Sequence, residues 1–300
     1  MAEPSTFTAV DLSRLPAPSV IEELDYDTIY GSMLAQLRAL IPTFDAMVES
    51  DPAVKLLQVA AYREMLLRQR VNDAARAVMP AFAMGSDLDH LAALFGVARL
   101  LITPADELEG VAAVYETDAD LRRRMTLAPE GYSVAGPEGA YIFHALSSSP
   151  DVLDASATST TPGNVLVTVL ARGANGAAGA GLVSSVAAYL SADTRRPMTD
   201  NVTVQSATIV PFAVEADITT FAGPDAAIVV ATARANLEGL LERTHRLGLD
   251  ITRARIFAAL ASPEGVQNVK LIQPAADIVL DRTQASWCSG VTIRQAGVGE

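Results

Sequence analysis

DPAVKLLQVAAYREMLLRQRVNDAARAVM, residues 51–79, is the longest segment of this chain that keeps a helical pattern without a breaker after Pro52. Asp51 can cap the first free N–H groups, Pro52 suits a first helical turn, and Pro80 ends the run. These signals predict a single helix about 40 Å long, given the usual rise per residue.

One face of this predicted helix carries apolar residues at the spacing of a helix–helix contact. The stripe consists of Leu56, Ala60, Leu67, Val71, Ala74 and Val78. A carboxylate, Glu64, interrupts it, and four arginines surround it: Arg63, Arg68, Arg70 and Arg76. The pattern is typical of a helix that binds a partner. It also fits an ordinary core helix within one chain, so the residues alone leave both interpretations open.

Length and composition limit the possible functions. Three hundred residues, half of them apolar, predict a globular protein with room for two or three domains. A formal net charge of -13 argues against sequence-independent nucleic-acid binding, which requires clustered Lys and Arg. The single cysteine, Cys288, excludes an intrachain disulfide and a cysteine-based zinc site. Because no apolar run reaches the length of a membrane span and residues 1–18 lack a signal-peptide pattern, we expect no membrane partner.

The N-terminal third reads as helical. Residues 1–19 are rich in Pro, Ser and Thr and predict an extended arm. Residues 20–41 carry apolar side chains at helical spacing, which predicts a first helix before the long one. A short helix is expected at 86–95, with Ser86 as part of a capping box and Gly96 at its end.

Two further units follow, in which helical and strand periodicities alternate. The first, residues 111–206, is expected to contain helices at 118–125, 137–149 and 181–192, and strands at 151–157, 164–171 and 201–206. The second, residues 207–300, is expected to contain helices at 224–247 and 252–261, and strands at 211–221, 266–272 and 291–294. The chain is therefore predicted to have an α+β fold: an N-terminal helical bundle region, residues 20–110, then two small α+β units with mostly antiparallel sheets.

A glycine-rich loop, RGANGAAGAG at residues 172–181, follows a predicted strand and precedes a helix, which is the context of a dinucleotide-binding loop. Its glycines do not give G-x-G-x-x-G, and no G-K-[ST] follows them. The preceding strand is expected to pair in a hairpin and not to start a parallel βαβ unit. A nucleotide-binding enzyme that uses the Gly173–Gly181 loop remains the alternative hypothesis.

No other pattern indicates catalysis or a metal. His90, His144 and His245 are far apart and form no metal-binding motif. No G-x-S-x-G elbow is present, and Cys288 has no histidine near it in the sequence. We therefore expect no catalytic residue, no cofactor and no metal, and we predict that the chain is not an enzyme.

Four long stretches carry a resemblance to a known family. They are DLSRLPAPSVIEELDYDTI at 11–29, AYREMLLRQRVNDAARAVMPAFAMGSDLDHLAALFGVAR at 61–99, RRPMTDNVTV at 195–204 and LGLDITRARIFAALASPEGVQNVKLIQPAADI at 247–278. Together they resemble the baseplate assembly protein J family of contractile-tailed phages. The resemblance spans almost the entire chain, and no single short motif carries it.

This resemblance implies a structural subunit of a baseplate wedge, located in the virion tail and assembled in the host bacterial cytoplasm. The implied partners are a second copy of the chain, a tail protein I-like wedge subunit, a lysozyme-like sheath-initiator wedge protein and the central hub or spike. N-terminal helices would bind the wedge partner, and C-terminal domains would join wedges into a ring.

The family also favours the partner-binding interpretation of the long helix. We predict an interface formed by Arg63, Glu64, Leu67, Arg68, Arg70, Val71 and Ala74. Because a buried carboxylate without a partner costs several kcal/mol, Glu64 is expected to meet a basic or backbone donor of another chain.

Overall fold

The computed structural model describes residues 18–299 apart from 45–47, 49, 109 and 224. Almost all of the predicted N-terminal arm, residues 1–19, lies outside the described residues. The described chain forms two compact units. The helical unit contains residues 18–98 and 117–122, and the mixed unit contains residues 99–116 and 123–299.

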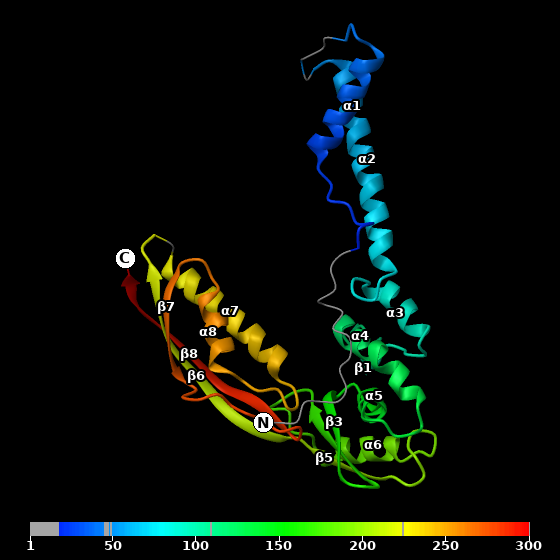
Figure 1. The fold of residues 1–300 in the computed structure, drawn as a ribbon, viewed down its shortest axis with the longest axis vertical. Coiled ribbons are helices and arrows are strands. Elements are labelled where there is room, and N and C mark those ends of the chain that lie inside the picture. The colour runs from blue at the N-terminus through cyan, green and yellow to red at the C-terminus, as the bar shows by residue number, and fades with distance from the viewer. Residues whose placement is uncertain (1–17, 45–47, 49, 109, 224, 300) are drawn as a thin grey trace. The chain divides into compact units, whose positions relative to one another are not determined.

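The helical unit is built on two helices that lie side by side, α1 (Tyr26–Leu40) and α2 (Pro52–Ala77) (Figure 1). The side chain of Asp51 accepts a hydrogen bond from the amide of Ala53 at 2.7 Å and caps α2, and Pro52 occupies its first turn. The predicted long helix is therefore confirmed almost to the residue. The first helix begins later than predicted, because Asp25 caps it through the amide of Thr28 at 2.8 Å.

The third helix, α3 (Gly85–Ala93), corrects a prediction. Its N-cap is Met84, which makes no side-chain capping bond, and Ser86 lies inside the helix, so the predicted capping box is wrong. Gly85 with a φ of 53° already starts the helix one residue before Ser86. The helix ends at Ala93 with Leu94 as its C-cap, two residues before the predicted end at Phe95. Gly96 closes the turn that follows: it has a φ of 69°, and the next amide bonds back to the carbonyl of Ala92 at 3.1 Å.

The first half of the mixed unit is a three-stranded sheet with helices packed on it. Its elements are α4 (Asp118–Leu127, whose first residues belong to the helical unit), the 3-10 helix η2 (Ala128–Tyr132), α5 (Glu138–Ser148), β3 (Val152–Thr161), β4 (Asn164–Ala171), α6 (Ala180–Leu190) and β5 (Asn201–Ser206). The sheet order is β3-β4-β5, with β3 antiparallel and β5 parallel to β4. Alternate residues of β4, such as Val167 and Val169, are fully buried against α5 and α6 in one core.

The second half repeats this construction with longer strands. Its elements are β6 (Thr208–Phe221), α7 (Ala226–Thr244), α8 (Arg253–Ala261), β7 (Val266–Gln273) and β8 (Gln284–Gly299). The sheet order is β7-β6-β8, with β7 antiparallel and β8 parallel to β6. Ile218 of β6, Leu237 of α7 and Ile256 of α8 are fully buried in its core.

The α+β class and the order of elements from β3 to β8 are as predicted. Three pairings between the described strands are antiparallel and two are parallel, so each three-stranded sheet is mixed. The last strand was predicted only at 291–294; it begins at Gln284, because β6 pairs with the whole segment although its first residues do not alternate in polarity. A short hairpin, β1 (Leu101–Thr103) with β2 (Val114–Tyr115), was not predicted.

His144 of α5 is expected to make the stability of the mixed unit depend on pH. It is only 9% exposed, lies beside the rings of Phe143 and Tyr189, and its Nε2 has no hydrogen-bond partner among the described residues. Burial, and secondly the positive charge of Arg195, lower its pKa below the ordinary 6.5. When the pH falls below 6.5, the unfolded chain binds a proton that the folded chain does not yet bind, so stability is lost.

We predict that the unfolding free energy of His144→Leu falls less than that of the wild type when the pH is lowered from neutral to about 5. Chemical denaturation at both pH values measures this difference. His90→Leu, a change at an exposed histidine, should keep the wild-type pH dependence. Equal losses in the wild type and His144→Leu would contradict the prediction.

Candidate partner interface

The helix α2 uses one face to pack against α1. Val54, Ala61 and Asn72 are its buried residues, and Ile29 of α1 is buried with them. Asn72 fixes this contact: its Nδ2 donates to the carbonyl of Glu22 at 2.8 Å, and its Oδ1 accepts from the amide of Glu22 at 3.0 Å. Both ends of one side-chain amide are thus satisfied by a single backbone position, which sets the register of the pair.

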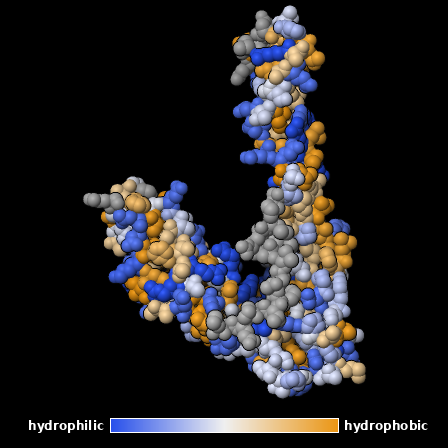
Figure 2. Space-filling model, in the orientation of Figure 1, coloured by the Kyte–Doolittle hydropathy of each residue, from blue (hydrophilic) through white to orange (hydrophobic). Residues whose placement is uncertain are grey.

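The predicted stripe lies on another face of α2, and the described residues leave it uncovered. Leu56 is 71% exposed, Leu67 69%, Val71 58% and Val78 68%. Val59 and Leu66 widen the same face. We call this the exposed face of α2: Leu56, Val59, Ala60, Arg63, Leu66, Leu67, Arg70, Val71, Ala74 and Val78. Figure 2 shows hydrophobic residues along this helix. An apolar surface that continues over about six helical turns is typical of an interaction site.

Two cations stand within this apolar surface. Arg63 and Arg70 are exposed, and no hydrogen bond or ion pair joins either side chain to another described residue. In a regular α-helix, both arginines lie within about 60° of Leu67 around the helix axis. Along the axis they are about 10 Å apart. The exposed face therefore combines an apolar seam with two guanidinium groups one heptad apart.

Glu64 and Arg68 lie at the border of this face and bind each other. Arg68 donates to Glu64 Oε1 from Nε at 3.0 Å and from Nη2 at 2.6 Å, and its Nη1 lies 3.3 Å from a carboxylate oxygen of Glu22. The hydrogen bond to Glu64 raises the pKa of Arg68. Glu64 thus has a partner within its own chain, and contact with a donor of another chain stays a prediction.

The site residues predicted from the sequence therefore divide into two groups. Five lie on the exposed face: Arg63, Leu67, Arg70, Val71 and Ala74. Glu64 and Arg68 form an ion pair beside it. The sequence did not show the role of Asn72, because a polar residue inside a helical pattern gives no sign of a clamp on the backbone of a residue 50 positions away.

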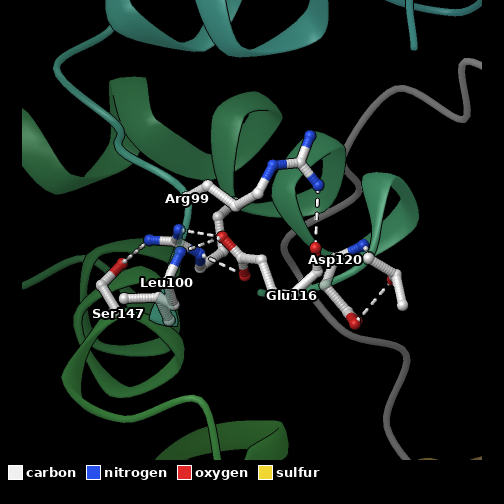
Figure 3. Close-up of polar contacts among 7 residues, drawn as sticks. Arg99, Leu100, Glu116, Asp120 and Ser147 are labelled. Atoms are coloured by element: carbon white, nitrogen blue, oxygen red, sulfur yellow. Dashed lines mark hydrogen bonds and ion pairs between the residues drawn. The ribbon is translucent and has the colours of Figure 1, made fainter. Parts of the chain in front are cut away.

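A second polar cluster holds the start of the mixed unit together (Figure 3). Glu116 and Arg124 form an ion pair in which both side chains are almost fully buried, at 4% and 6% exposure. Glu116 also accepts a hydrogen bond from the amide of Leu100 at 2.9 Å, and Arg99 donates to its carbonyl at 2.8 Å. Arg124 further reaches Ser147 of α5 at 3.4 Å. The cluster attaches the β1–β2 hairpin to α4 and α5, so its role is structural.

A set of hydrogen bonds, which we call the joint, connects the two sheets of the mixed unit. No sequence pattern predicted its residues. Asp154 of β3 accepts from Arg123 at 2.5 Å and from the amide of Leu247 at 2.9 Å. Ser156 donates to the carbonyl of Arg282 at 2.5 Å, and Arg282 pairs with Glu138. Leu247 lies 93 residues after Asp154 in the sequence, and Arg282 lies 126 residues after Ser156. Only the fold therefore reveals the joint.

The glycine-rich loop is part of the same region, and several of its amides donate hydrogen bonds within the fold. β4 pairs in a hairpin as predicted, but it also starts a parallel β4–α6–β5 unit, which corrects the expectation that it would not. Gly176 donates to the carbonyl of Gly173 at 3.0 Å, and the amide of Ala178 donates to Ser206 at 2.9 Å. Gly176 has a φ of 93°, and a Cβ there would lie 2.7 Å from His245 Nε2. Gly176 therefore serves a tight turn that packs against His245 and Leu170.

Other chemistry has little support in the described part of the chain. Within it, no group of three His, Cys, Asp or Glu side chains is arranged to hold a metal ion, and no helix has the length and hydropathy of a membrane span. Burial raises the pKa of the Cys288 thiol, which lowers the thiolate fraction that a nucleophile needs.

Comparisons with known proteins identify the family. Three baseplate J-like models match the chain in order: the N-terminal domain at residues 49–106, the central domain at 133–206 and the C-terminal domain at 212–294. The chain therefore belongs to the baseplate J-like family, as the resemblance predicted.

One curated relative matches over nearly its whole length. The chain is 45% identical over 300 residues to baseplate protein J of Escherichia phage P2, covering 97% of this chain and 99% of that protein. A chain in the cryo-EM structure of the anti-feeding prophage baseplate aligns with a TM-score of 0.41 and 16% identity, over 61% of this chain and 43% of its own length.

The Glu116–Arg124 pair yields a stability prediction. Arg124→Met leaves a buried carboxylate uncompensated and should lower the unfolding free energy by about 3 kcal/mol or more. Adding Glu116→Gln removes that charge while keeping an acceptor for Leu100, so the double variant should recover much of the loss. Arg294→Met, which breaks an ion pair at a 59% exposed side chain, should cost less than about 1 kcal/mol. Denaturant titration measures all three, and a double variant no more stable than Arg124→Met would contradict the expectation.

Proposed function

We propose that this chain is a structural subunit of a contractile-tail baseplate wedge and that the exposed face of α2 binds a helix of another wedge subunit. The observation that supports the proposal most is this uncovered apolar face, which lies within the segment that matches the J-like N-terminal domain. An amphipathic helix in an apolar groove or bundle is a common mode of protein recognition. Family membership supports a structural and not an enzymatic role.

In this proposal each region has its own task. Residues 20–110 bind the wedge partner, for which a tail protein I-like subunit is the first candidate. The α+β units, residues 111–206 and 207–300, contact further copies of the chain and join wedges into a ring around the central hub, because a closed ring needs more than one interface per subunit. The lysozyme-like sheath-initiator protein and the hub or spike are further partners. The location is the virion tail, after assembly in the host cytoplasm.

Leu67→Glu tests the proposed interface. Because Leu67 is exposed in the free chain, the variant should fold with an unchanged thermal midpoint. In the complex, a carboxylate placed in an apolar seam costs several kcal/mol, so recovery of the partner should fall at least about tenfold. The measurement is affinity purification of the tagged full chain after co-expression with the other tail proteins of its particle.

Ile228→Glu is the matched control, because Ile228 is an apolar residue of α7 that is 65% exposed and lies outside residues 20–110. It should recover the same partners as the wild type. If Leu67→Glu also recovers them at the wild-type level, the exposed face of α2 is not the interface.

A further inference from the structure

We propose that the partner of the exposed face of α2 is an acidic amphipathic helix of a protein other than this chain, whose two carboxylates about one heptad apart pair with Arg63 and Arg70. This inference rests on the proposed function of that face and goes further, because it specifies the charge of the partner and excludes a second copy. It starts from two exposed guanidinium groups that stand in an apolar surface.

Arg70 lies between Leu67 and Val71 in the sequence, and Arg63 lies one turn before Leu67. A helix that covers Leu67 and Val71 therefore also covers both arginines. Removal of a guanidinium from water without an acceptor costs several kcal/mol, so a stable complex must supply acceptors at both positions. The planar guanidinium binds a carboxylate through two parallel hydrogen bonds, which makes Asp or Glu the best match. Since Arg63 and Arg70 are seven residues apart, carboxylates one heptad apart on the partner helix would meet them in register.

Among the described residues, α2 itself does not supply these carboxylates. Glu64, the nearest on α2, already accepts two hydrogen bonds from Arg68. Asp73 lies 3.7 Å from Arg76 in an ion pair one turn away. Neither carboxylate is therefore available to Arg63 or Arg70 without loss of its present partner.

A second copy is a poor occupant for electrostatic reasons. Two antiparallel α2 helices that crossed at the centre of this face, near Leu67, would place Arg63 of one against Arg70 of the other, and a parallel pair in register would place each arginine against its own equivalent. Like charges across a seam cost several kcal/mol. On α1 and its cap the described acidic residues are Asp25 and Asp27, two positions apart at one end, which cannot span a heptad. The geometry favours an association between different proteins.

Charge reversal tests the inference. Arg63→Glu/Arg70→Glu in the full chain, co-expressed with the other tail proteins of the particle, should lower recovery of the partner at least about 100-fold. Arg63→Leu/Arg70→Leu should keep the complex within about tenfold of the wild type. It should also lose the salt sensitivity that we expect of the wild type between ~0.05 and ~0.5 M NaCl. The control, Arg243→Glu/Arg255→Glu, reverses two exposed arginines of α7 and α8 and should bind like the wild type.

Zero-length carbodiimide crosslinking identifies the partner. This reagent couples amines to carboxylates in contact, so the charge-conserving variants Arg63→Lys and Arg70→Lys should each form a crosslink in the assembled complex. Peptide mass spectrometry should map both crosslinks to Asp or Glu residues about seven apart in one helix of another tail protein. Crosslinks to a second copy of this chain would overturn the inference, and so would charge-reversed variants that bind normally.

These results separate the inference from the proposed function. If Leu67→Glu abolishes binding and the charge reversal does not, the exposed face is an interface but its partner is not acidic. If neither change affects binding, both proposals fail.

Discussion

The pairing of α1 with α2 is the contact on which the proposed role depends. α2 is 26 residues long and has apolar residues on more of its surface than one neighbouring helix can cover. Val54, Ala61 and the Asn72 clamp commit one side to α1, and this commitment fixes which side stays uncovered. A rotation of α2 about its axis would bury the other stripe but would turn Asn72 away from Glu22 and break both hydrogen bonds of the clamp. The clamp thereby presents Leu67 and Val71 outward.

In the mixed unit, buried polar groups perform a comparable task. Asp154 lies between the two sheets with 5% of its surface exposed, and both of its oxygens accept hydrogen bonds, one of them charge-assisted. A buried carboxylate is tolerated only when such partners are in place. The geometry of the joint is therefore selective, because sliding one sheet against the other would separate Asp154 from Leu247 and Ser156 from Arg282. The apolar contact of Leu170 and Ala285 beside it supplies burial without this directional requirement.

The sequence predicted those features that depend on neighbours along the chain. The bounds of α2 follow from Asp51, Pro52 and Pro80, and the strands of the first sheet follow from period-two alternation. Features that depend on distant partners were missed or truncated. The first residues of β8 become strand because β6 supplies a parallel partner, and the amide clamp of Asn72 exists only because α2 returns along α1 and brings Asn72 to Glu22. For the site, periodicity identified the stripe but could not say whether α1 would cover it.

The arginines at positions 63 and 70 also affect how the free chain behaves before assembly. An uncovered apolar stripe of this length would promote self-association in the free subunit. Two guanidinium groups within the stripe oppose that association, because any contact between two copies of the face desolvates four cations without an acceptor. The same cations become favourable once carboxylates of the correct spacing arrive, since the desolvation cost is then offset by paired charges. Residues that weaken the wrong contact and strengthen the right one give a larger difference in affinity than apolar burial can provide alone. Under the proposed pairing, the two arginines serve specificity both in the free chain and in the complex.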